Sequence, residues 1–243
     1  MRRISQYTVG CALALALIAS PAGPVQAAPS GTVVLFYMFQ DYSTNARATD
    51  LSGRGHHAIP LRSNGGSIRA VTRADGRAAA FPAPCRPSSG HKCPRAILQA
   101  ANHPDLNPGT RSFRYGAIVM LRPAETSAGS NVIQKGYYTS AAQWKLQVDG
   151  RGGRPSCVLA RSGHGYLVAA GVSVADGGWH QVDCRRAGRE LSIAVDGRVR
   201  GRIGLPANLN ISNSEPVRIG GRSTAQSNDQ FFGSVDNVYF SLG

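Results

Sequence analysis

Apolar and polar residues alternate through the last third of the chain, in short segments separated by glycine. The segments are 177–204 (GGWHQVDCRRAGRELSIAVDGRVRGRIG), 216–222 (PVRIGGR) and 231–242 (FFGSVDNVYFSL). A repeat of two places successive side chains on opposite faces of an extended strand, so one face of each strand is apolar. The pattern predicts antiparallel strands that each bury one face against a common core.

The same pattern extends toward the N-terminus. In 111–121, alternate residues from Phe113 to Leu121 share one apolar face. We expect further strands at 33–39, just after the turn at 49–60, and at 78–81, 132–135, 144–149, 156–161 and 166–169. Residues 62–95 are rich in turn residues and proline and are predicted to be a loose loop insertion. About a dozen short strands without a helix predict an all-β fold, a two-sheet antiparallel sandwich.

Two of these motifs resemble those of a known family. The C-terminal series, with its Trp-His strand, Val-Asp-Gly turn, Ile-Gly-Gly strand and closing Gly-x-x-Asp strand, is similar to laminin G-like, concanavalin A-like jelly rolls. Residues 50–55, Asp-Leu-Ser-Gly-Arg-Gly, resemble the turn after the family's first strand. The resemblance implies a jelly roll over about Val33 to Leu242, and a fold does not by itself assign a ligand.

The resemblance also implies a metal site. Asp50 and Asp236 match positions that in laminin G-like relatives often help to bind one structural Ca²⁺, with turn carbonyls completing the oxygen ligands. The alternative is that Asp50 only caps its turn by accepting backbone N–H bonds. Arg54 and the adjacent histidines add positive charge near this turn.

The N-terminus predicts export. Arg2 and Arg3 precede an apolar run at 9–18 and a small-residue region that ends at Ala27, which is typical of a signal peptide, residues 1–27. The run is shorter than the ~20 residues that a membrane span needs. We therefore expect a secreted, extracellular product without membrane insertion, in which 28–243 form a single domain.

Cysteine usage agrees with an oxidising destination. Cys11 belongs to the signal peptide, which leaves Cys85, Cys93, Cys157 and Cys184. Of the three possible connectivities, the local one is the most economical and predicts Cys85–Cys93 and Cys157–Cys184, with Cys157 and Cys184 in adjacent strands. Zinc ligation by these cysteines is disfavoured because the chain has no C-x-x-C pair.

Carboxylate spacing bears on catalysis. Many sugar-cleaving enzymes on this scaffold use two glutamates a few residues apart on one strand, whereas Glu125, Glu190 and Glu215 are far apart and lie in or beside turns. The sequence therefore predicts no catalytic residues of this type.

Histidines and tyrosines are the other candidate site residues. His180 is predicted to face the core, and His56 and His57 to be exposed in the glycine-rich turn. Tyr137, Tyr138, Trp144 and Tyr166 come from neighbouring strands or loops. Trp144 is expected in the core, and Tyr137, Tyr138 and Tyr166 are the candidate contacts for a sugar ring.

The formal charge is +14, or +12 without Arg2 and Arg3, and favours anionic partners at low salt. Scattered arginines, 24 of the 27 basic residues, are equally expected from composition alone. No helix is available to enter a nucleic-acid groove, so specific nucleic-acid binding is not predicted. The predicted function is a non-catalytic module that binds a polysaccharide or cell-surface glycan, with anionic glycans included. The alternatives are a glycoside hydrolase or polysaccharide lyase on the same scaffold, and a basic structural protein of the cell wall.

Overall fold

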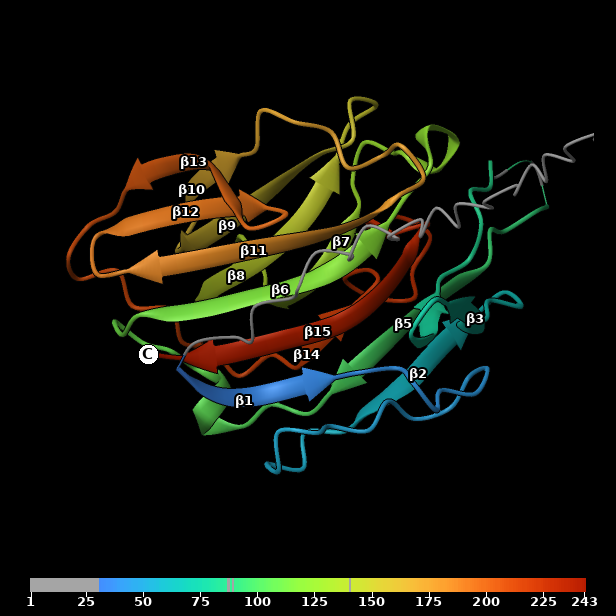
Figure 1. Cartoon of the computed structure of the whole chain (residues 1–243), viewed down its shortest axis with the longest axis horizontal. Coiled ribbons are helices and arrows are strands. Elements are labelled where there is room, and N and C mark those ends of the chain that lie inside the picture. The colour runs from blue at the N-terminus through green and yellow to red at the C-terminus, as the bar shows by residue number, and fades with distance from the viewer. Residues whose placement is uncertain (1–30, 87, 89, 140) are drawn as a thin grey trace, which may run out of the picture.

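The computed structural model of the chain describes residues 31–86, 88, 90–139 and 141–243, and the predicted signal peptide at 1–27 lies outside them. The described residues form two antiparallel sheets that pack face to face as a sandwich (Figure 1). The alternation in the sequence predicts this architecture, because each sheet must cover one apolar face. Within the described part, no helix is long and apolar enough to span a membrane.

The first sheet has eight strands in the order β13-β12-β11-β6-β15-β4-β3, and β1 also pairs with β15. Its strands are β1 (Thr32–Tyr37), β3 (Arg69–Arg73), β4 (Gly76–Ala80), β6 (Phe113–Met120), β11 (Trp179–Ala187), β12 (Glu190–Val195), β13 (Arg198–Gly204) and β15 (Ser234–Leu242). The first strand thus lies beside the last strand, which closes the domain.

The second sheet has seven strands in the order β10-β9-β8-β7-β14-β5-β2. They are β2 (Ala58–Ser63), β5 (Arg95–Ala100), β7 (Asn131–Gly136), β8 (Ala142–Asp149), β9 (Arg154–Arg161), β10 (His164–Ala169) and β14 (Val217–Ile219). Two 3₁₀ turns, η1 (Pro104–Leu106) and η2 (Pro123–Glu125), lie in the connections.

The core lies between the two sheets, and aromatic rings from both fill its centre. Trp144 of β8 packs against Tyr115 of β6 and Phe240 of β15, with ring centroids 5.0 and 5.1 Å apart. The predicted inward face of β6 is confirmed, since its alternate residues from Phe113 to Leu121 are at most 1% exposed. Such pairs add stability beyond the apolar area that they bury.

Both predicted disulfides are present, but one has a different setting from that expected. Cys157 and Cys184 were expected in adjacent strands of a sheet. Cys157 instead belongs to β9 and Cys184 to β11, so the bond crosses the core from one sheet to the other. Both residues are fully buried. The bond therefore fixes the spacing of the two sheets.

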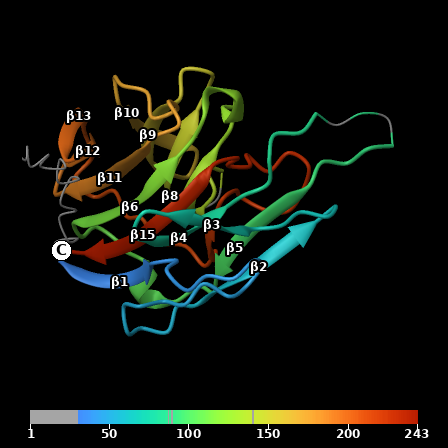
Figure 2. The same ribbon diagram turned by 45° about the vertical axis from the view of Figure 1, so that its right-hand side comes forward.

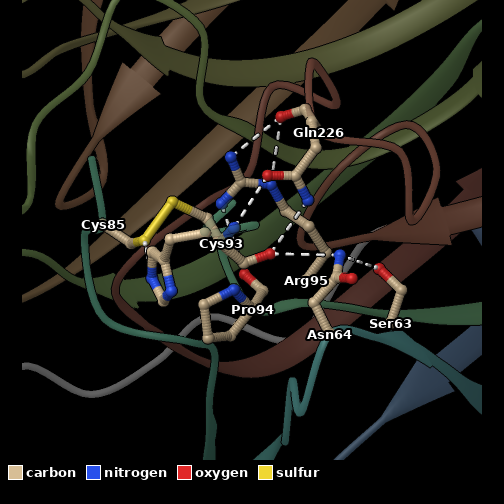
Figure 3. Close-up of a disulfide and its surroundings, with 8 residues drawn as sticks. Ser63, Asn64, Cys85, Cys93, Pro94, Arg95 and Gln226 are labelled. Atoms are coloured by element: carbon tan, nitrogen blue, oxygen red, sulfur yellow. Dashed lines mark hydrogen bonds between the residues drawn. A yellow bond between two sulfur atoms is a disulfide. The ribbon is translucent and has the colours of Figure 1, made fainter. Parts of the chain in front are cut away.

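The other disulfide secures the proline-rich loop between β4 and β5, which projects from one end of the sandwich (Figure 2). The side-chain amide of Gln226 both donates to and accepts from the backbone of Cys93, at 3.0 and 2.8 Å (Figure 3). The Arg95 guanidinium donates to the Gln226 carbonyl at 2.8 Å. These contacts attach the disulfide-closed loop to the segment that follows β14.

Residues 62–95 are more regular than the predicted loose insertion. They contain the end of β2, then β3 and β4, which extend the eight-stranded sheet, and the irregular parts are 64–68 and the stretch after Ala80. The strand β5 was not predicted. Its residues Ala96, Ile97 and Leu98 are consecutive and all buried, so the segment lacks the alternation of a half-exposed strand.

Candidate functional site

The outer face of the seven-stranded sheet is polar. In β8, Trp144, Leu146 and Val148 point into the core and are 0% exposed. Gln143, Lys145 and Gln147 alternate with them and must therefore point to the opposite, outer face. Across the ladder, Gln134 of β7 is opposite Lys145, and Arg218 of β14 is opposite Gln134. A row of amide and cationic side chains therefore crosses three strands.

Gln134, Gln143 and Lys145 of this row form the floor of a cleft of about 310 Å³, which we call the tyrosine cleft. Its lining residues come from β7, β8, the loop between them and the loop after β14, and are Asn131, Gln134, Tyr137, Tyr138, Thr139, Gln143, Lys145, Arg222 and Asp229. A few polar groups that converge on a concave surface are typical of a small-molecule site.

Two consecutive tyrosines form one wall. The Tyr137 hydroxyl donates to the Arg222 carbonyl at 3.2 Å, and the Arg218 guanidinium lies 5.2 Å from the centre of the Tyr137 ring. The Tyr138 side chain is 48% exposed. It packs over Gly165 of β10, where an added Cβ would lie 2.6 Å from the ring. The absence of a side chain at Gly165 thus lets the Tyr138 ring rest against the sheet.

Side-chain amides form a connected network in the floor. Asn131 donates through Nδ2 to Gln134 Oε1 at 2.5 Å, and Gln134 and Gln143 each donate to the Gly136 carbonyl at 3.1 Å. Asn131 is 1% exposed, and its Oδ1 has no hydrogen-bond partner. A buried acceptor without a donor is costly, so a ligand hydroxyl that donates here would gain more than it would in water.

Charge in the cleft is mixed. Burial lowers the pKa of the Lys145 ammonium, which the nearby carboxylates of Asp149 and Asp229 partly offset. Burial also raises the pKa of Asp149, although the hydrogen bond from the Ser130 N–H and the charge of Lys145 lower it in part. Arg222 Nε lies 3.5 Å from Asp229 Oδ2. A cationic group with a pKa displaced by burial is more frequent at functional sites than elsewhere.

The structure brings Tyr137 and Tyr138 together but separates Tyr166 from them. Because Gly165 faces Tyr138, the next residue of the strand must face the other way. Tyr166 packs against the core cluster and lines a different cleft, together with Arg161, Ser162, His164, Pro206, Asn208 and Leu209. The three tyrosines are therefore not one platform.

Asp50 caps its turn. Its two oxygens accept from the N–H groups of Phe36, Ser52 and His56 and from the Ser52 hydroxyl, at 2.8–3.0 Å. Burial alone would raise the pKa of Asp50, but these hydrogen bonds outweigh it and hold the pKa below its usual value. A Ca²⁺ ion would have to displace these donors.

Asp236 is also held by donors. It lies in β15 just before Asn237, whose φ of 46° accompanies a shift in the register of the strand. Its carboxylate accepts from the N–H groups of Asn237 and Phe39 at 2.8 and 3.3 Å and pairs with the Arg73 guanidinium. A Ca²⁺ ion would have to replace donors at both carboxylates, and the calcium site stays a prediction.

Two expectations for histidines differ from the structure. His56 is 8% exposed rather than on the surface, because its ring turns inward to Asp105. His180 was predicted in the core but lies at the end of the sheet. Its Nδ1 and Nε2 are 2.8 and 3.0 Å from carboxylate oxygens of Asp196 and Asp176.

The polar floor of the cleft was not identified from the sequence. Its signal is the order Gln143, Lys145 and Gln147 in one strand, alternating with apolar residues. The loop of Arg222 and Asp229 carries no such signal, since only the fold brings it beside β7.

Comparison with known proteins assigns the family. A family profile described as the concanavalin A-like lectin/glucanase superfamily matches residues 100–241, more than half of the chain. The chain belongs to the concanavalin A-like lectin/glucanase superfamily. A comparison of this superfamily member with curated protein sequences finds no match.

Several solved structures share the fold of this chain at low sequence identity. Domain 4 of AbnA, an extracellular arabinanase from Geobacillus stearothermophilus solved with arabinotriose, has a TM-score of 0.65 and 12% identity, over 88% of this chain and 93% of that chain. The binding domain of paraclostridial mosquitocidal protein 1 has a TM-score of 0.64 and 10% identity, over 86% and 48%. Botulinum neurotoxin type C, described as entering cells by interaction with two ganglioside molecules, has a TM-score of 0.61 and 10% identity, over 86% and 48%. This chain spans about half the length of the two toxin chains.

Proposed function

We propose that this chain is a secreted, non-catalytic module that binds a polysaccharide or cell-surface glycan in the tyrosine cleft. The observation that carries the proposal is the pairing of an exposed aromatic ring, Tyr138, with buried amides that include the unpartnered Oδ1 of Asn131. A sugar ring offers C–H groups that pack on an aromatic face and hydroxyls that donate and accept at amides.

The fold relatives support the ligand class. Domain 4 of AbnA was solved with arabinotriose, and the type C neurotoxin is described as dependent on gangliosides. The two disulfides support a destination outside the cell, where disulfides persist.

The positions of the acidic residues support a non-catalytic role. Glu125, Glu190 and Glu215 each form an ion pair with an arginine, at 3.4, 3.4 and 3.1 Å, and none of them lines the tyrosine cleft. Among the described lining residues, Asp229 is the one carboxylate. Glycoside hydrolysis usually needs two carboxyl groups that flank the scissile bond.

The cations support an acidic glycan as the preferred ligand. Lys145 and Arg222 both line the cleft, and the formal charge of the chain is +14. Such a field attracts anions at low salt, and exposed charges are screened beyond about 8 Å at 0.15 M salt.

A panel of neutral and acidic polysaccharides tests the proposal. The mature chain is mixed with each insoluble polymer at low and at physiological salt, and both retained protein and released oligosaccharide are measured. We expect retention by at least one polymer, stronger for acidic polymers at low salt, without release of oligosaccharide. Release of oligosaccharide would establish the enzyme instead, and no retention at either salt would refute glycan binding for the panel.

A further inference from the structure

A second cluster of potential ligand atoms lies far from the tyrosine cleft in sequence. It joins the turn after β1 to η1, and consists of His56, His103 and Asp105. His56 Nε2 lies 2.9 Å from Asp105 Oδ1, and His103 Nδ1 lies 2.6 Å from the same oxygen. One potential ligand atom from each residue lies within 4.8 Å of the other two.

We propose that this cluster is a binding site for a divalent transition metal, with Zn²⁺ as the best fit. Two imidazole nitrogens and one carboxylate oxygen are a common three-residue ligand set for zinc, with water as the fourth ligand. Tetrahedral ligands at 2.0–2.1 Å from zinc are about 3.3 Å from one another. The nitrogen-to-oxygen distances of 2.6 and 2.9 Å need only a small expansion to reach this spacing.

The buried ligand is already held in place. The His56 N–H donates to Asp50 Oδ2 at 2.9 Å, and its carbonyl accepts from the Tyr37 hydroxyl. Both backbone groups of His56 are thus fixed before any metal arrives. A preformed ligand loses little conformational freedom on binding, which favours affinity.

The cluster is open on one side. The His103 side chain is 56% exposed, whereas that of His56 is 7% exposed, so an ion can enter from solvent and meet a buried ligand. Arg54 Nη1 lies 3.9 Å from Asp105 Oδ2 and opposes a cation, but its side chain is 48% exposed and can turn toward water.

The same contacts without a metal would form a His–Asp–His hydrogen-bonded link. In that case each imidazole donates one N–H to the carboxylate, and no ion is needed. The proposal differs because zinc replaces those protons and should bind one equivalent per chain. The other cluster of this kind in the described residues, Cys85, His91 and Cys93, is not available, because its two sulfurs are joined in a disulfide.

The test uses the untagged mature chain, stripped of metal with chelator and titrated with Zn²⁺ in a calorimeter. We expect one equivalent to bind, and the melting temperature to rise by roughly 5–10 °C at a hundredfold excess of free Zn²⁺ over Kd. Ca²⁺ or Mg²⁺ should not compete with Zn²⁺ for this cluster, because these ions prefer all-oxygen ligands.

Variants locate the site. His103→Ala and Asp105→Asn should each weaken Zn²⁺ binding by at least about tenfold. His164→Ala is the matched control, since His164 is an exposed histidine in β10, and it should bind Zn²⁺ like the wild type. Melting in chelator shows whether each variant folds. A wild-type Kd weaker than about 100 µM, or Zn²⁺ binding that both ligand variants retain, would overturn the proposal and leave the hydrogen-bonded link.

Discussion

The carboxylate of Asp50 accepts from three backbone N–H groups and from the Ser52 hydroxyl at the turn after β1. Its removal leaves the three N–H donors without their acceptor, whereas the Ser52 hydroxyl can still donate to the Val34 carbonyl at 2.8 Å. We expect Asp50→Ala to lower the free energy of unfolding by about 3 kcal/mol at pH 7, since donors left unpaired cost more than the bonds contribute. Urea denaturation with and without millimolar calcium measures this loss. A calcium-dependent rise in the melting temperature of the wild type that Asp50→Ala abolishes would instead confirm the predicted metal site.

The loss of unfolding free energy in Asp50→Ala should also depend on pH. The pKa of Asp50 is held below its usual value in the folded state, so its contribution is full above about pH 4 and is lost as the pH falls through the folded-state pKa. The difference between the wild type and Asp50→Ala should therefore shrink in strong acid. An equal difference at pH 7 and at pH 2 would contradict this assignment.

His180 is a second titrating residue, and its contribution to stability changes with pH in the direction opposite to that of Asp50. Burial would lower the pKa of His180, but hydrogen bonds to Asp196 and Asp176 outweigh it and raise the pKa. A raised pKa means that the stabilisation is complete below about pH 6.5 and is lost as the pH rises through the folded-state value. We expect His180→Gln to reduce the fall in melting temperature between pH 6 and pH 9. An NMR titration that places the His180 pKa below that of a free histidine would contradict the account.

At the scale of elements, the two disulfides should differ in how much they contribute to the free energy of unfolding. The loop closed by Cys157–Cys184 spans 27 residues of sequence separation, and that closed by Cys85–Cys93 spans 8. Loop-closure entropy gives about 3.6 and 2.6 kcal/mol for these two bonds. The double variant Cys157→Ala with Cys184→Ala should lose more, because it also opens space between the sheets.

Chemical denaturation of the two double variants measures this order. Cys85→Ala with Cys93→Ala, on a projecting loop, is the natural comparison. A smaller loss for the inter-sheet pair than for the loop pair would contradict the position assigned to Cys157 and Cys184.

The elements that the sequence predicts are strands with one face exposed to solvent and the other face buried. Segments such as β12 (Glu190–Val195), in which buried and more exposed residues alternate, have water on one side only, so periodicity reveals them. Buried segments such as β5 lose that signal, and the order of strands within a sheet has no local signature at all. For this reason the sequence predicts adjacent strands for Cys157 and Cys184, whereas they lie in different sheets, although their pairing is confirmed.

The candidate site shows the same limit. Tyr137 and Tyr138 are adjacent in sequence and stay together, whereas Tyr166 is turned away by a single step of alternation. Lys135 lies opposite Trp144 and faces inward, and it is fully buried because Asn107 and Asn213 accept from its ammonium. Such partners come from distant segments, and no local sequence pattern predicts them.

At the scale of the whole molecule, the central proposal is that a glycan binds in the tyrosine cleft. The cleft combines β7, β8 and the loop after β14, so only the assembled seven-stranded sheet presents it. Tyr138 is the residue to change, because it is exposed and its loss should leave the fold intact.

The decisive measurement is the Kd of the best-retained polysaccharide, or of an oligosaccharide from it, for the wild type, Tyr138→Ala and Val199→Ala. Val199 is an exposed apolar residue of β13 in the other sheet. We predict a Kd about tenfold weaker for Tyr138→Ala, which corresponds to ~1.4 kcal/mol of lost ring contact, and a change within about twofold for Val199→Ala. If Tyr138→Ala binds as tightly as the wild type, the glycan does not occupy the tyrosine cleft and the central claim is wrong.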